Sequence, residues 1–246
     1  MNNLQDTLLF PVRDAQARSQ FLFACLIGLA GFIVPILPWI LLTGYTAKIM
    51  RQVIEERKDP SMPEWQGSDW SAMLVDGIRL YGTQLVLSLP LFAVIFFGMF
   101  AVFGGSTAMT IGFSEGEDWA GSLGLLFLLG GIGFFLLFSL LSLPYTIIIS
   151  AAGPHVVSRN SFEAAFQFKE WWGIFRKGMG QFILAYAVSM ALSFVLMFAM
   201  QVAMMTIVLI CVVPLIMIPY STYITILMNT LYAQAYCAGK DALEKA

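Results

Sequence analysis

Few side chains in this sequence are of a type that could do chemistry. The chain has one histidine, His155, in the segment PHVVSR, and three cysteines, Cys25, Cys211 and Cys237. The cysteines lack metal-ligand spacing and lie within or at the end of apolar stretches, so we expect packing thiols. A lone histidine without a nucleophile or paired acids predicts a packing or headgroup-level residue. We therefore expect no enzyme, no cofactor and no metal site.

A second polar pattern lies near the end of the chain, in STYITILMNTLYAQAY (221–236). Its polar side chains recur at helical spacing and share one face, which makes a polar stripe of Ser221, Thr225, Asn229, Tyr232 and Tyr236. Within hydrocarbon such a stripe must face protein or water. It either forms hydrogen bonds between helices or lines a path for a small neutral ligand, and we favour the structural role.

The composition places these residues in a membrane protein. Hydrophobic residues make up 59% of the chain, charged residues 11%, and the mean hydropathy is +0.81. No Asp, Glu, Lys or Arg occurs in residues 19–47, 80–114, 119–158 or 178–239. A membrane-spanning helix needs about 20 apolar residues. Each block is long enough to cross, and the last must fold back to cross twice.

We therefore expect an all-α, polytopic helix bundle. Five membrane spans are predicted near residues 20–47, 83–105, 120–152, 181–203 and 207–237. An alternative is that the first block breaks at Gly31, Pro35 or Pro38 into a short hairpin, which raises the count to six.

Basic residues predict the orientation. Lys and Arg concentrate in residues 48–79, 159–177 and the tail 238–246, whereas 106–118 holds only acidic charges. The positive-inside rule places the basic segments in the cytoplasm. Five spans then put the N-terminal segment 1–18 outside, although it carries Arg13 and Arg18; six spans would return it to the cytoplasm. No cleavable signal peptide is expected.

The charged segment SFEAAFQFKEWWGIFRKGMG (161–180) is unusually rich in aromatic residues. Asn160 with Glu163 predicts a helix start, and Gly178 predicts its end. We expect an amphipathic helix in the cytoplasmic interface that uses its aromatic face for lipid or a partner, with contact residues Phe168, Trp171, Trp172 and Phe175. The alternative is that these aromatic side chains pack on the bundle itself.

Two further tryptophans, Trp65 and Trp70, lie among the acidic residues Glu64, Asp69 and Asp76. This grouping is compatible with cation binding or partner docking, but a solvated loop with interfacial tryptophans is the simpler interpretation. We include Trp65 and Trp70 among the predicted interfacial contacts.

A weak internal repeat relates two parts of the chain. A shift of 101 residues aligns 69–82 with 170–183, and the apolar blocks carry the related triplets LPW (37–39), LPY (143–145) and IPY (218–220). Two parallel repeat units, 19–105 and 119–203, followed by a final span at 207–237, would form a single membrane domain of residues 1–246.

An ordered set of short motifs extends over nearly the whole chain. LLTGY (41–45), MPEW (62–65), DG (76–77) and AAFQF (164–168) together resemble the prokaryotic membrane family known as domain of unknown function 4013. The resemblance implies an integral protein of a bacterial or archaeal plasma membrane. It implies no activity, cofactor or site residues.

Two functions fit these features. A non-enzymatic scaffold or accessory subunit is favoured by the interfacial aromatic residues and by the absence of charges from the apolar blocks. A small transporter or lipid-handling protein that uses the polar stripe is the alternative. The expected partners are membrane lipids and a protein partner or second copy; no basic tract indicates nucleic acid.

Overall fold

The computed structural model describes residues 4–31, 33–205 and 213–245, and every element within these ranges is helical. The all-α prediction is confirmed for this part of the chain. The helices are α1 (Leu4–Leu9), η1 (Phe10–Val12), α2 (Ala15–Ala30), α3 (Leu37–Ile54), η2 (Gly67–Asp69), α4 (Trp70–Ser114), α5 (Asp118–Ile149), α6 (Ala152–Arg159), η3 (Phe162–Phe166), α7 (Phe168–Met204) and α9 (Val213–Glu244). They form two compact units, Met1–Gln84 with Ile149–Ala246, and Leu85–Ile148.

The first apolar block is two helices. The predicted single helix over 20–47 is wrong, because α2 ends at Ala30 and α3 begins at Leu37. Pro35 and Pro38 lack backbone N–H groups, and Ile36 has a positive φ of 76°, so a continuous helix cannot form here. The alternative, a break within residues 31–38, is what the structure shows.

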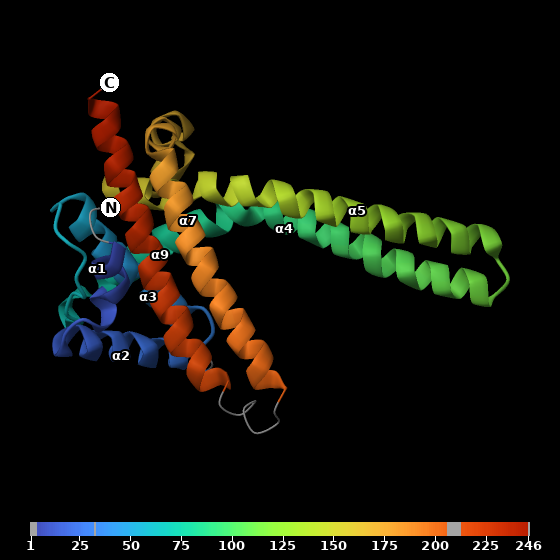
Figure 1. Cartoon of the computed structure of the whole chain (residues 1–246), viewed down its shortest axis with the longest axis horizontal. Helices are drawn as coiled ribbons and strands as arrows, with labels where there is room; N and C mark the ends of the chain where they lie inside the picture. Colours follow the sequence, from blue (N-terminus) through green and yellow to red (C-terminus); the bar gives the residue numbers. More distant parts are fainter. Residues whose placement is uncertain (1–3, 32, 206–212, 246) are drawn as a thin grey trace. The chain divides into compact units, whose positions relative to one another are not determined.

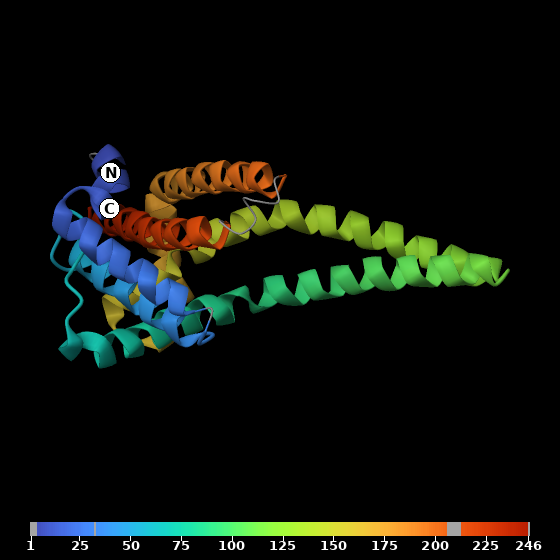
Figure 2. The ribbon, with the colours of Figure 1, turned by 90° about the horizontal axis from the view of Figure 1, so that it is seen from below.

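Helix α9 is the centre of the first unit. It packs along α7 and also contacts α3 and α2, so that helices distant in sequence lie side by side (Figures 1 and 2). The side chains of Ile226, Leu227 and Leu231 are fully buried. Because protein surrounds α9 on several sides, its polar residues need not meet lipid.

Helices α3 and α4 cross at two glycines. A Cβ atom on Gly44 would overlap the carbonyl group of Met73, and one on Gly77 would overlap the carbonyl oxygen of Ile40. Each glycine therefore admits the backbone of the other helix. These glycines belong to the LLTGY and DG motifs, so both motifs mark one helix crossing.

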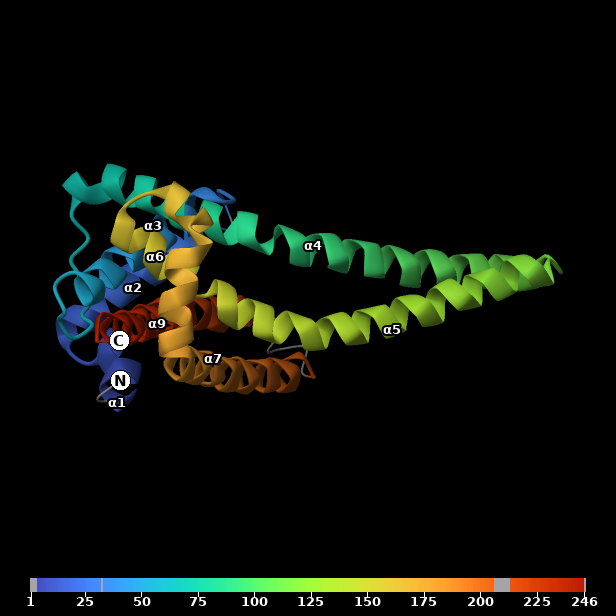
Figure 3. The same cartoon turned by 90° about the horizontal axis from the view of Figure 1, so that it is seen from above.

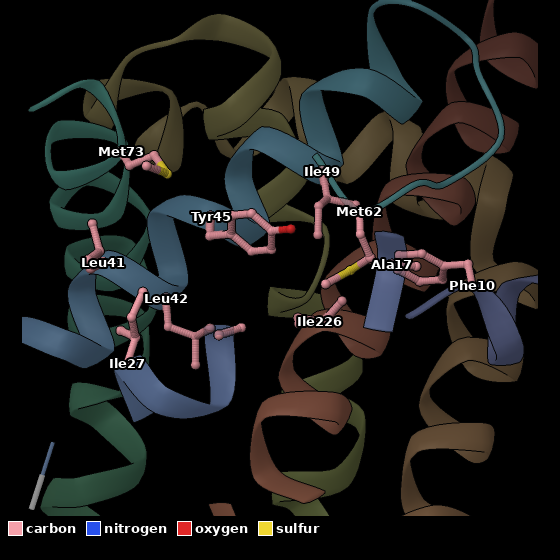
Figure 4. Packing of buried hydrophobic residues seen from close by; sticks show 11 residues of the cluster. Phe10, Ala17, Ile27, Leu41, Leu42, Tyr45, Ile49, Met62, Met73 and Ile226 are labelled. Atoms are coloured by element: carbon pink, nitrogen blue, oxygen red, sulfur yellow. The ribbon is translucent and has the colours of Figure 1, made fainter. Parts of the chain in front are cut away.

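The apolar core of the first unit surrounds Tyr45. Tyr45 is completely buried, and Leu42, Ile49, Met73 and Ile226 are almost or fully buried around it (Figure 4). Each such side chain contributes roughly 1.5–3 kcal/mol by leaving water. The core joins α2, α3, α4 and α9 with the loop residue Met62.

The second unit consists of the remainder of α4 and most of α5, which run antiparallel (Figure 3). Gly105, Gly112 and Gly124 let the two backbones approach closely, because a Cβ on any of them would overlap the facing backbone. The outward side chains are apolar: Phe96 is 67% exposed and Phe100 71%. Such surface suits contact with lipid.

Three helical stretches are long and apolar enough to cross a membrane: Gly67–Ser114, Asp118–Arg159 and Phe168–Val202. They contain the whole of the spans predicted at 83–105 and 120–152 and residues 181–202 of that predicted at 181–203. The first residues of the span predicted at 207–237, including Cys211, lie outside the described residues. The predicted five-span count is therefore supported only for three helices.

The helix crossing predicts the effect of adding one methyl group. Gly77→Ala places its Cβ against the Ile40 carbonyl and should lower the stability of the folded protein by about 1–3 kcal/mol, the usual cost of overpacking. Thermal unfolding in detergent measures this. Gly82→Ala is the matched control on the same helix, because its Cβ would lie 3.4 Å from the Phe162 ring. Equal unfolding temperatures for both variants would contradict the crossing.

Candidate functional site

The charged end of the first unit is the end where the loop between α3 and η2 lies. A contact at this end joins the motifs LLTGY and MPEW. The Tyr45 hydroxyl donates to the Pro63 carbonyl oxygen at 2.8 Å, and its ring stacks on Trp65 with centroids 4.0 Å apart. Trp65 Nε1–H donates to the Gln20 carbonyl oxygen at 3.2 Å. Trp65 therefore fixes the loop onto α2 and α3. Trp65 thus has a packing role in the fold, and its interfacial contact stays a prediction.

Asp69, at the end of this loop, and Asp76, on α4, are paired with basic residues of the same unit. Asp69 lies 2.6 Å from Lys48 Nζ, and Asp76 lies 2.9 Å from Arg51 Nη2 and 3.4 Å from Arg79 Nη1. No group of three or more His, Cys, Asp or Glu side chains in the described residues is arranged to hold a metal ion. These carboxylates therefore join helices electrostatically, at a modest gain for partly exposed pairs.

The only histidine is the centre of a network that sequence reasoning did not assemble. His155 is 1% exposed; its Nδ1 lies 2.9 Å from the Tyr236 hydroxyl, and its Nε2 lies 3.3 Å from Gln167 Oε1. Ser158 Oγ lies 3.1 Å from the same tyrosine oxygen. The network joins α6, α9 and Gln167, the residue between η3 and α7.

This network resembles a structural clamp more than a catalytic pair. Ser158 Oγ–H donates to the backbone carbonyl oxygen of His155 at 2.8 Å, so its proton is not directed at the imidazole ring. Glu170 lies 3.6 Å from His155 Nε2 and is itself paired with Arg159 at 2.7 Å. Both ring nitrogens of His155 thus meet side chains of neighbouring elements. A nucleophile activated by a base requires a direct contact between the two.

Most of the polar stripe is satisfied within α9. Ser221 donates to the Ile218 carbonyl, Thr225 to the Ser221 carbonyl and Asn229 to the Thr225 carbonyl. Tyr232 is buried near Phe182, with ring centroids 6.5 Å apart. Among the described residues, Tyr236 is the member of the stripe with hydrogen bonds to side chains of another helix, namely His155 and Ser158 of α6. Within the described residues, the hydrogen bonds of Ser221, Thr225 and Asn229 thus go to carbonyl groups of the preceding turn of α9, as short polar side chains in helices commonly do.

The aromatic segment divides into buried and exposed residues. Trp171 and Phe175 are each 3% exposed, and Trp171 Nε1–H donates to the Ala165 carbonyl oxygen at 3.1 Å. Phe168 is 52% exposed and Trp172 40%. Trp171 and Phe175 thus pack inward, as the alternative prediction has it, whereas Phe168 and Trp172 face outward; their contact with lipid or a partner stays a prediction.

The boundaries predicted for this segment are wrong. Asn160 follows the last residue of α6 and does not start a helix. It has a left-handed backbone conformation, which asparagine tolerates because its short amide side chain can form local hydrogen bonds. Helix α7 begins at Phe168 and continues through Gly178 to Met204. A Cβ on Gly178 would lie 3.0 Å from the Ala235 carbonyl oxygen, so this glycine serves packing on α9 and not helix termination.

Exposed aromatic residues gather close to the start of α7. We define the exposed aromatic set as Phe162, Phe166, Phe168 and Trp172, which are between 36% and 52% exposed. Phe162 and Phe166 contact edge to face. The basic side chains of Lys169 and Arg176 are exposed on the same helix. Trp70, at the start of α4, is likewise 40% exposed.

The end of α9 is tied to the first loop. Arg57 donates to both carboxylate oxygens of Asp241, at 2.6 and 3.1 Å, and this pairing raises the pKa of the guanidinium. Cys237 Sγ lies 3.6 Å from the Val53 carbonyl oxygen. Cys25 and Cys237 are both buried and unpaired, as packing thiols would be; Cys211 lies outside the described residues.

A comparison with known protein families matches the region of the chain that contains these motifs. Residues 27–205 match the family described as protein of unknown function (DUF4013). The chain belongs to this family. The DUF4013 region contains the Tyr45–Trp65 contact, the glycine crossing and His155, whereas Tyr236 lies beyond it. No curated protein and no solved structure matches the chain.

The histidine network predicts a stability effect confined to one hydroxyl. Tyr236→Phe removes the partner of His155 Nδ1 in a buried site and should lower the free energy of unfolding by about 1–3 kcal/mol. Tyr186→Phe on α7 is the matched control, because the described residues give its hydroxyl no hydrogen bond. Thermal unfolding in detergent distinguishes them. Unchanged stability of Tyr236→Phe would show that the network contributes nothing.

Proposed function

We propose that this DUF4013 protein is a non-enzymatic scaffold or accessory subunit of a prokaryotic plasma membrane. Its working surface is the exposed aromatic set at the start of α7. The observation that carries this proposal is that the beginning of α7 has one buried side and one exposed side, with Trp171 at 3% and Trp172 at 40% exposure. We call the buried side the anchored half and the exposed side the free half of the helix.

The anchored half gives the surface a rigid support. Trp171 is bonded to Ala165, and Phe175 packs on Phe182 with ring centroids 5.4 Å apart. Phe182 is in turn fully buried against the bundle. Phe168 and Trp172 are therefore presented on a fixed helix. A preorganised aromatic surface loses little conformational entropy when it binds.

The free half has the chemistry of a membrane-interface or partner contact. Aromatic side chains favour the boundary between headgroups and acyl chains, and Lys169 and Arg176 suit anionic headgroups there. In water the same exposed rings would lose the free energy of apolar burial. Burial of these rings in the interface, against an adjacent partner subunit, would recover that energy.

The buried polar groups support a role without catalysis. His155 is held between Tyr236 and Gln167, and Ser158 donates to a backbone carbonyl. The alternative, a small transporter or lipid-handling protein, depends on the polar stripe. Because Ser221, Thr225 and Asn229 bond to carbonyls of α9 itself, the stripe ranks second as a working surface.

An internal repeat is consistent with this architecture. Gly77 and Gly178, which are related by the shift of 101 residues, both lie where a helix approaches another backbone closely. Tyr145 of LPY donates to the Leu87 carbonyl, and Tyr220 of IPY donates to the Leu192 carbonyl. We propose from these two tyrosine hydrogen bonds that α4 with α5 and α7 with α9 are the two repeated units. These boundaries differ from the units 19–105 and 119–203 expected from the sequence.

The proposal predicts that partner or lipid retention depends on the free half of α7. The double substitution of Phe168→Ala and Trp172→Ala should reduce a stoichiometric protein partner or bound anionic lipid at least tenfold, as measured by native mass spectrometry of gently extracted protein. Asn229→Leu is the control for the polar stripe and should retain both. The reverse pattern, with loss only in Asn229→Leu, would favour transport.

The anchored half should respond differently. Trp171→Ala removes a buried indole and its hydrogen bond, and should lower the free energy of unfolding by about 3–5 kcal/mol. Trp172→Ala, the neighbouring control, should change it by less than about 1 kcal/mol. Thermal unfolding with equal losses for both variants would contradict the division of this helix into two halves.

A further inference from the structure

The N-terminal segment lies at the charged end of the first unit, together with the C-terminal helix. Gln234 Nε2–H donates to Thr7 Oγ1 at 3.1 Å, and Gln16 Nε2–H donates to Glu64 Oε1 at 2.9 Å. The first loop meets the same helix end through Arg57 and Asp241. The chain start, the basic loop and the end of α9 therefore share one end of this unit.

Helix α2 runs away from this end of the unit, and α3 runs back to it. The Val53 carbonyl meets Cys237 at the charged end, whereas a Cβ on Gly28 would lie 3.3 Å from Ile218, which is five turns earlier on α9. The connection between α2 and α3 thus lies toward the opposite end of α9. The two helices form a hairpin (Figures 1 and 2).

The tip of this hairpin is strongly apolar and exposed. We define the tip as Ile33, Val34, Ile36 and Leu37, which are 84%, 46%, 59% and 53% exposed. Along α2, Leu22, Leu26 and Leu29 recur at helical spacing and are also exposed. In water each of these side chains would forgo roughly 1.5–3 kcal/mol of burial energy.

The backbone of the connection suits an apolar surrounding. The N–H groups of Gly31, Ile33, Val34 and Leu37 all donate to carbonyl groups within residues 28–35. Pro35 has no N–H to satisfy. Irregular backbone is excluded from hydrocarbon because an unsatisfied N–H group there costs free energy. This turn avoids much of that cost because these N–H groups have acceptors.

The hairpin is too short to cross. The apolar part of α2 extends from Phe21 to Ala30, and that of α3 extends from Leu37 to Ala47, so each arm rises about 15 Å through apolar residues. The hydrocarbon core of a bilayer is about 30 Å thick. At the charged end, Arg13 and Arg18 of the N-terminal segment join Lys48 and Arg51, as expected for one cytoplasmic face.

We infer that α2–α3 is a re-entrant hairpin whose tip enters the acyl chains of the bilayer and leaves by the face it entered. Both termini then lie on the same side, and α4, α5, α7 and α9 make four crossings. The inference rests on the membrane residence proposed above. It replaces the five-span arrangement and removes the conflict between Arg13, Arg18 and an external N-terminus.

Side-specific labelling tests the entry and return. In a background with Cys25, Cys211 and Cys237 replaced by alanine, single cysteines are placed by Ala15→Cys, Lys58→Cys and Glu115→Cys. A membrane-impermeant maleimide is applied to intact cells and to inverted vesicles. Ala15→Cys and Lys58→Cys should label from one side and Glu115→Cys from the other. Labelling of Ala15→Cys from the side of Glu115→Cys would overturn the inference.

Depth-dependent quenching tests the tip. An environment-sensitive fluorophore on Ile33→Cys, in vesicles of phosphatidylcholine and phosphatidylglycerol, should be quenched at least twofold more by acyl-brominated lipid than the same probe on Ser19→Cys. Phe127→Cys, on the apolar surface of α5, tests membrane residence itself. Quenching at Phe127→Cys but not at Ile33→Cys overturns the hairpin alone; quenching at neither position overturns the proposed membrane function as well.

Discussion

The close approach of α3 and α4 at Gly44 and Gly77 is the contact on which the first unit depends. Without side chains at these positions the two backbones meet, and Tyr45, the residue next to Gly44, is turned into the core. There its hydroxyl bonds to Pro63 and its ring supports Trp65. A larger residue at either glycine would separate the helices and open the contact that fixes the loop.

The second constraint is that polar groups in an apolar bundle must find partners within the protein. Helix α9 meets it in two ways: hydroxyl and amide groups of the polar stripe bond to the preceding turn, and Tyr236 bonds to His155. The charged end meets it with paired residues such as Lys48 with Asp69. The exposed surface of the described residues includes many large apolar and aromatic side chains, and our proposals assign this surface to lipid and to a partner.

These two constraints place the functional proposal on the surface of the bundle and not in its interior. The interior groups serve packing, whereas the uncharged side chains of Phe168, Trp172 and Ile33 are exposed. The aromatic set would act at the headgroup boundary, and the hairpin tip would act deeper among acyl chains. Both surfaces belong to the same unit, so one rigid core supports them.

The sequence by itself determined the helical class, the family and the apolar helices, because hydropathy and charge are properties of local segments and a span requires only about 20 apolar residues. Only the tertiary structure decided that Trp171 is buried while Trp172 is exposed, since a helical wheel does not say which neighbour covers a face. It also joined His155 to Tyr236, 81 residues away, and placed Thr7 of the N-terminal segment beside Gln234 near the end of α9. Pairings of such range depend on how the helices cross, and two glycines set that crossing between α3 and α4.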